Sequence, residues 1–318
     1  MFKNLSAFAY NPSFRPSLAE ALEAVDKQSF LPCGPTQRVS VGFTPPRHVA
    51  NSPLIESHQK HWFLEVTIEK RDLPGAVVNR KLEERLQDIL DKTGRKPTGK
   101  FKKSLKEELV LELLPKAFTK IETLTLWLDP TRHLLSIDNC SKGKVELVTT
   151  LLASTFPGFY LKPLNTAQSV SACTAAWLLD GEPPSDFTID DECSLVDNSG
   201  HAKSVIKYTN HNLFIDQIQD HLREGKYPVN VALTWRSRIS FIVTDTLQLK
   251  KLSFLDVVFA DSGYGEGEAF DVSAAIITGE LSPLLADLVE AFGGLEMDDP
   301  HAAKATPNPE SEELAEVF

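Results

Sequence analysis

Positive charge is concentrated in one short stretch of this chain. Residues 92–106, KTGRKPTGKFKKSLK, contain no acidic residue, although the whole chain has a formal net charge of −11. Seven residues in the stretch are basic: Lys92, Arg95, Lys96, Lys100, Lys102, Lys103 and Lys106. Clustered cations bind a line of phosphates by releasing the counterions condensed on it. The stretch therefore favours contact with a nucleic-acid backbone, and a basic segment kept for solubility is the alternative.

A second cluster is acidic and indicates a different chemistry. The segment SDFTIDDE contains Asp186, Asp190, Asp191 and Glu192. Carboxylates that converge on one point can hold the metal ions of a nuclease. Spacing alone does not show such convergence, so we expect a solvated acidic loop and keep a metal-dependent nuclease as an alternative.

Other motifs give weaker signals for a catalytic or metal site. His58 and His61 lie three residues apart in HQKH, but two histidines do not complete a zinc site. The segment GYGEGE at 263–268 lacks the Lys-Ser/Thr pair of a phosphate-binding loop. The four cysteines are scattered and form no C-x-x-C pair, so we expect small, mostly buried residues: Cys33, Cys140, Cys173 and Cys193. The sequence predicts no catalytic residue, no metal site and no cofactor.

The composition is that of a soluble globular protein. Of the 318 residues, 42% are apolar and 24% are charged. No run of about 18 apolar residues occurs and no signal-peptide pattern is visible, so we expect a cytoplasmic protein without a membrane span. Seven acidic residues and one Lys between Leu295 and Phe318 predict a disordered acidic tail at 295–318.

Two helices must position the basic stretch. Apolar spacing predicts a helix over 77–94 that ends at Gly94, and a second helix over 104–118. Ser104 and Glu107 form a capping-box pattern at the start of the second helix, and Pro115 ends or kinks it. The basic residues between the helices then lie in an exposed connection. Phe118 follows the helix, either packed in its own core or projecting toward another subunit.

The remaining pattern mixes strands and helices without strict alternation. Strands are predicted over 1–10, 61–70, 121–129, 132–139, 230–235, 239–245 and 271–278. Helices are predicted over 17–28, 144–156, 172–179, 212–225 and 279–294. This order favours the α+β class over a parallel α/β fold.

Several segments together resemble one known family. LPGAVVNRKLEERL, GRK and SLKEELVLELLPKAFTK are similar to a central part of the RdgC family of recombination-associated proteins. FLPCG with VGFTPP, HLREGKYPVNVALTW and AAIITGELSPLLADLVEAFGG resemble further parts of that family in the same order. The resemblance covers about residues 2–294.

The resemblance implies a multi-lobed, horseshoe-shaped subunit with mixed sheets and a projecting helical-hairpin tip. Two such subunits are expected to form a ring-shaped homodimer with a basic inner surface. It implies binding of double-stranded DNA with little sequence preference, and no enzymatic activity. It also implies a nucleoid-associated role in recombination and replication-fork repair that limits access of the strand-exchange protein RecA to DNA.

The resemblance also carries over to single residues. It implies that Phe118 closes the ring against the partner subunit and that Arg95 and Lys96 contact DNA. Asn210 and His211 occupy the positions expected to face DNA before a base helix. Relatives often carry a basic residue there, so the tip should supply more of the positive charge in this chain. Together with the lysines of the stretch, the predicted DNA-binding set is Arg95, Lys96, Lys100, Lys102, Lys103, Lys106, Asn210 and His211.

The predicted organisation has four parts. Residues 1–74 plus 121–165 form a central α/β region, 75–120 the helical tip, 166–294 an α+β base, and 295–318 the acidic tail. The leading hypothesis is a sequence-independent DNA clamp. A nuclease using the 186–192 acids and a protein-interaction adaptor without DNA binding stay open.

Overall fold

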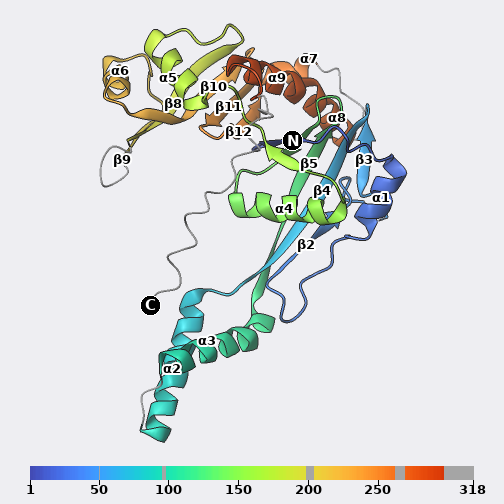
Figure 1. Ribbon diagram of the computed structural model, residues 1–318, viewed down its shortest axis with the longest axis vertical. Coiled ribbons are helices and arrows are strands. Elements are labelled where there is room, and N and C mark those ends of the chain that lie inside the picture. The colour runs from blue at the N-terminus through green and yellow to red at the C-terminus, as the bar shows by residue number, and fades with distance from the viewer. Residues whose placement is uncertain (50, 95–97, 198–203, 262–268, 297–318) are drawn as a thin grey trace, which may run out of the picture.

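The chain has an α+β architecture with two antiparallel sheets. The computed structural model describes residues 1–49, 51–94, 98–197, 204–261 and 269–296 (Figure 1). The first sheet has the order β2-β4-β5-β6-β1-β7, with β3 paired to β4. Its strands are β1 (Ser6–Tyr10), β2 (Val39–Thr44), β3 (Ile55–His58), β4 (His61–Asp72), β5 (Phe118–Asp129), β6 (Leu134–Ile137) and β7 (Leu161–Pro163). The sequence prediction of the α+β class is confirmed.

A long pair of strands forms the axis of the molecule. β4 and β5 stay in register from Trp62 opposite Leu128 to Asp72 opposite Phe118. At that far end the chain continues into α2 (Gly75–Thr93) and α3 (Gly99–Leu113), which project from the body in Figure 1. The two helices bury a small apolar cluster against one another: Leu82, Leu105 and Leu109, flanked by Leu86 and Ile89. The cluster holds the α2–α3 pair together.

The sequence predicts the end of α2 correctly and the start of α3 incorrectly. Gly94 adopts φ 63° and donates its N–H to the Leu90 carbonyl, which ends α2 as predicted. The predicted start of α3 at Ser104 is wrong. Thr98 is the N-cap, and its side-chain oxygen accepts a hydrogen bond from the Phe101 N–H. The helix therefore begins within the basic stretch.

Two helices flank the first sheet, α1 (Leu18–Asp26) and α4 (Lys142–Thr155). Ser17 and Glu20 form a full capping box at the start of α1. β2 approaches the chain after α1 so closely that a Cβ on Gly42 would lie 2.4 Å from the Phe30 Cα. Only glycine fits there without moving the backbone.

The second sheet forms the base, with the order β12-β11-β10-β8-β9. Its strands are β8 (Phe187–Asp197), β9 (Ser204–Tyr208), β10 (Tyr227–Trp235), β11 (Ile239–Thr244) and β12 (Leu249–Phe254). The accompanying helices are α5 (Val170–Asp180), α6 (Asp216–Arg223), α7 (Asp256–Asp261), α8 (Ala269–Ile276) and α9 (Ser282–Ala291). A π-helical turn, η2 (Ile277–Leu281), joins the last two.

The predicted strand over 271–278 is wrong, because these residues form α8 and the start of η2. Their buried positions continue at helical spacing through Leu281 at the end of η2 into α9, where Leu284, Leu285 and Leu288 enter the base core. The helical run 269–291 is long and apolar enough to cross a membrane, with a mean hydropathy of 1.5 in its most apolar window. Half of that window is buried inside the protein, as in a core helix.

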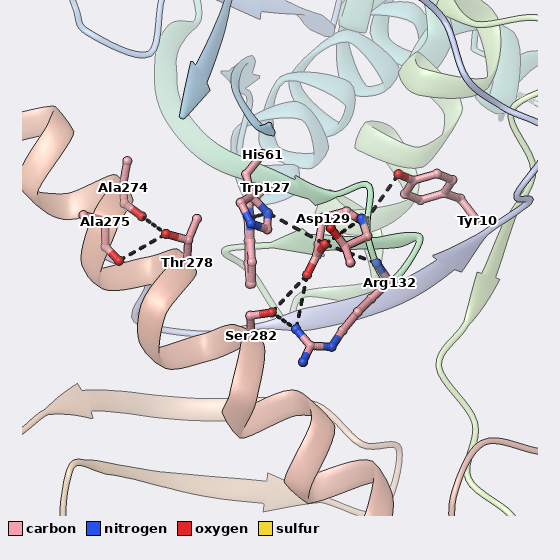
Figure 2. Close-up of polar contacts among 10 residues, drawn as sticks. Tyr10, His61, Trp127, Asp129, Arg132, Ala274, Ala275, Thr278 and Ser282 are labelled. Carbon is pink, nitrogen blue, oxygen red and sulfur yellow. Dashed lines mark hydrogen bonds and ion pairs between the residues drawn. The ribbon is translucent and has the colours of Figure 1, made fainter. Parts of the chain in front are cut away.

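A buried polar cluster joins the first sheet to the base (Figure 2). The Ser282 hydroxyl of α9 donates to the Asp129 carboxylate at 3.0 Å, and the Arg132 guanidinium contacts both groups. Trp127 donates its indole N–H to His61 Nδ1 at 3.2 Å. Burial lowers the pKa of His61, which keeps Nδ1 available as an acceptor. Since Asp129 is 2% exposed, this cluster ties α9 firmly to the end of β5.

Candidate nucleic-acid interface

Four of the predicted DNA-binding lysines lie on α3. Lys100, Lys102, Lys103 and Lys106 belong to its first two turns and are all exposed. We expected Lys100, Lys102 and Lys103 in the connection before a helix that starts at Ser104, and this expectation is wrong because Thr98 starts the helix earlier. Arg95 and Lys96 lie outside the described residues. The structure thus brings four of the predicted cations onto one rigid element.

Their charges are not neutralised by neighbouring carboxylates. Among the described residues, none of these four lysines forms an ion pair. Other cations of the α2–α3 pair do so: Lys81 contacts Glu84 at 2.7 Å, and Arg85 contacts Glu112 at 3.0 Å. The first turn of α3 also contains no acidic residue. Cations at a helix N-terminus oppose the helix dipole, so a bound anion would relieve this repulsion.

A basic groove borders α3 where it meets the sheet. Two adjoining hollows of about 560 and 530 Å³ share four lining residues, Arg38, Lys106, Val110 and Leu114. Five cations line the groove: Arg38 just before β2, Lys70 and Arg71 on β4, and Lys103 and Lys106 on α3. Its acidic lining residues are Asp72 and Glu107. The groove combines net positive charge with an apolar floor.

The sheet residues of this groove were missed by sequence reasoning. Arg38 precedes β2, whose first residue Val39 pairs with Lys70 on β4, and only this register brings them together. The Lys70-Arg71 doublet at a predicted strand end was the available signal. Arg71 has a structural part as well, because it donates to the carbonyls of Leu114, Ala117 and Cys33.

Phe118 projects into solvent at the first position of β5. Its side chain is 89% exposed, which rules out packing in the core of its own chain. Two further apolar side chains of this region are also exposed, Ile121 on β5 and Leu111 on α3. Leu111 also lines the groove, and exposed large apolar side chains in such a place are suited to a protein partner.

Asn210 and His211 lie between β9 and α6 in the base, and α6 lies far from the α2–α3 pair in Figure 1. Both are exposed, and Asn210 adopts φ 50°. His211 donates its backbone N–H to the Asp191 carbonyl at 3.1 Å, and its Nδ1 lies 2.8 Å from the Asn212 carbonyl oxygen. The structure therefore does not bring these two residues together with the lysines within one chain.

The 186–192 acids do not form the expected loop, since most of them belong to β8. Three of the four acids form separate contacts: Asp186 pairs with Arg236 at 3.1 Å, Asp190 accepts from the Thr234 hydroxyl at 2.8 Å, and Glu192 pairs with Lys251 at 2.7 Å. Burial raises the pKa of Asp190. Within the described part of the chain, no group of three or more His, Cys, Asp or Glu side chains is placed to hold a metal ion.

The histidines of HQKH lie at the β3–β4 hairpin, where His58 pairs with His61 across a two-residue turn. Gln59 and Lys60 both adopt positive φ, as a tight hairpin turn requires. The segment 263–268 lies outside the described residues. All four cysteines are free, and only Cys140 is not fully buried.

Comparison with known proteins gives one consistent result. The family model described as "Putative exonuclease, RdgC" matches residues 1–295. The recombination-associated protein RdgC of Dechloromonas aromatica is 36% identical over 299 residues, covering 92% of this chain and 97% of that protein. The recombination-associated protein RdgC of Herminiimonas arsenicoxydans is 35% identical over 297 residues, covering 92% of this chain and 98% of that protein. The chain belongs to the RdgC family of recombination-associated proteins.

Proposed function

We propose that this chain binds double-stranded DNA without sequence preference, as a ring-shaped homodimeric clamp that performs no catalysis. One observation carries the proposal: four exposed lysines on α3 form no ion pair among the described residues, in a chain of net charge −11. The local field, and not the net charge, decides where a polyanion binds. Lysine contacts to phosphate carry no sequence information, so binding should not depend on sequence.

The α2–α3 pair is suited to act as the projecting tip of the subunit. In Figure 1 the base and this pair lie at opposite ends of β4 and β5, and both extend toward the same side. Two such horseshoe-shaped subunits joined at both ends would enclose a hole. Lysines at the start of α3 would then supply positive charge to its lining, with Arg95, Lys96, Asn210 and His211 as further contacts.

The exposed apolar residues support closure of the ring at this pair. In a two-fold symmetric interface the same surface serves both subunits. Phe118 of each subunit would then enter the apolar floor of the other subunit's basic groove, formed by Val110 and Leu114. A large aromatic anchor in a pocket is the usual centre of such an interface.

The name of the relatives, recombination-associated protein RdgC, supports a role in recombination. We infer that this chain acts in recombination and replication-fork repair, in the cytoplasm at the nucleoid. A clamp that occupies duplex DNA limits the access of RecA to it. The proposed partners are therefore duplex DNA and a second copy of the chain, with functional antagonism of RecA.

The clamp is tested by comparing linear duplex with covalently closed circles. A ring that encloses DNA leaves a linear molecule by sliding off its ends, so we expect complexes on closed circles to survive a salt wash that removes linear DNA. Cutting the circle should release the protein. Equal loss from both forms would refute enclosure, and no binding to random duplex at about 50 mM salt would favour the adaptor.

The family description favours a second candidate, an exonuclease. End-labelled duplex incubated with the protein and Mg²⁺ or Mn²⁺ decides between the two. The clamp predicts intact DNA. Loss of the label, abolished by Asp190→Asn, would assign nuclease activity to the acids of β8 instead.

A further inference from the structure

An aromatic cavity lies at the opposite end of β4 and β5 from the basic groove. Its volume is about 430 Å³, within the range of small-molecule sites. Trp62 and Leu128 line it, and they pair across the two strands at the end remote from Asp72 and Phe118. Ten residues of strand separate the two ends, which corresponds to roughly 33 Å. The cavity is therefore independent of the proposed tip contacts.

Four of the nine residues that line the cavity carry aromatic rings. Tyr10 is 6% exposed and contacts the His133 ring edge-to-face, with centroids 5.5 Å apart. Phe14 packs on Phe159, with centroids 4.5 Å apart. Trp62 completes the aromatic lining. Such surfaces favour a flat ring, which can stack on their faces.

The loop that carries Phe14 and Arg15 is anchored to the body. The Asn11 side chain donates to the Gly158 carbonyl at 3.1 Å and accepts from the Tyr160 N–H at 2.8 Å. Arg15 donates through Nε to the Pro12 carbonyl at 3.0 Å. The cavity is thus pre-formed, and its lining holds its position without a ligand.

Charge and hydrogen bonding define the chemistry of the ligand. Arg15 is the charged lining residue, it is exposed, and it forms no ion pair among the described residues. The His133 Nδ1 atom is buried and has no hydrogen-bond partner in the described part of the protein. Tyr10 directs its hydroxyl toward the Asp129 backbone carbonyl at 3.4 Å, as Figure 2 shows. A flat ring attached to an anionic group complements this set of aromatic faces and one cation.

We propose that this cavity binds a nucleotide, with the base between the aromatic side chains and the phosphate at Arg15. The nucleotide can be free or a unit of single-stranded nucleic acid, because both present the same ring and the same anion. Bases of an intact duplex are stacked and paired, so duplex DNA in the proposed ring would leave this site empty.

Deoxyadenosine monophosphate and a ten-residue oligothymidylate, each titrated against the full chain, test the proposal. Quenching of Trp62 fluorescence reports binding, and Trp62→Phe identifies its share of the signal. We expect saturable quenching and about a tenfold weaker affinity in Arg15→Ala, the usual effect of losing one charge-assisted contact. Lys27→Ala is the matched control, because Lys27 is an exposed lysine just after α1 and its replacement removes the same charge outside the cavity.

The two probes separate the possible sources of the ligand. Arg15-dependent binding of the monophosphate supports a free nucleotide, and such binding of the oligonucleotide alone supports a single strand. Equal binding by Arg15→Ala and the unaltered chain, or no saturable quenching by either probe, would overturn the proposal. Quenching by a proline-rich peptide but by neither nucleotide would also overturn it. Binding of duplex by the α3 lysines is measured separately and is unaffected by these outcomes.

Discussion

Replacing Lys100, Lys102 and Lys103 with Ala should weaken duplex binding in a way that depends strongly on salt. These three lysines are exposed and, within the described ranges, unpaired, so each is free to replace a cation condensed on DNA. Each neutralised phosphate contributes about 0.9 to the slope of log affinity against log salt. The triple variant should therefore lower the slope by up to about 2.7 for each α3 helix that touches DNA.

The size of the effect follows from that slope. A fourfold rise in salt, from about 50 to about 200 mM, should cost the unaltered chain roughly 40-fold more affinity than the variant. Fluorescence anisotropy with labelled random duplexes measures both slopes. All sequences should be weakened alike, because phosphate contacts do not read bases.

A charge-matched variant shows whether the weaker DNA binding depends on the position of the lysines or only on the net charge of the chain. Lys27, Lys60 and Lys251 are exposed lysines on other parts of the molecule, and replacing them with Ala removes the same total charge. This control should keep the slope of the unaltered chain. A triple α3 variant with an unchanged slope, or a control with an equal loss, would refute the assignment of the contacts to α3.

Four further outcomes are expected. Phe118→Asp should abolish one of the two proposed subunit contacts, which light scattering would detect. The unfolding free energy should change by less than about 0.5 kcal/mol, because the side chain is exposed. A large loss of stability would contradict this. Gly42→Ala should destabilise the fold by about 1–3 kcal/mol or more in denaturant unfolding, since its Cβ would overlap Phe30; unchanged stability would be inconsistent with the close approach. Lys120 and Lys144 hold the pKa of Glu122 at about 2, so the ionised Glu122 stabilises the folded protein above about pH 4.5, and this stabilisation is lost as the pH falls toward 2. Glu122→Gln should therefore remove about 1 kcal/mol of the acid-dependent loss of unfolding free energy. Identical plots of stability against pH for the variant and the unaltered chain would count against this. Deleting the predicted acidic tail, residues 295–318, should raise DNA affinity at low salt because its carboxylates compete with DNA for the basic groove, and unchanged affinity would exclude that competition.

The sequence predicted the elements whose local signals agree with their packing. The helix predicted over 17–28, the Gly94 stop and the β-rich run that becomes β4 all rest on local features, and the structure contains each. Helix spacing in α2 likewise matches its buried positions, Val78 and Leu82.

Errors arose where two local signals competed or where packing overrode propensity. Thr98 and Ser104 are both acceptable N-caps, and the helix extends to the earlier one because Phe101 and the lysines do not interrupt it. The β-branched run 271–278 favours a strand in isolation, but burial against the base core makes it helical. Long-range packing decides such segments, and local propensity does not report it.

The candidate interface was predictable in part. Charge alone indicated the lysines of α3, whereas Arg38 and Lys70 join them only through the register of β2 and β4. The aromatic cavity combines Phe14, Trp62 and His133 from three separate segments. No spacing rule connects those positions, so the fold was needed to find the cavity.

The most direct test of the central claim is lysine reactivity measured with and without duplex DNA. Brief acetylation followed by mass spectrometry reports each lysine of the full chain separately. The account predicts that duplex protects Lys100, Lys102, Lys103 and Lys106 at low salt, and that Lys27 and Lys251 stay as reactive as in the free protein. Equal reactivity of the α3 lysines with and without bound duplex would contradict it.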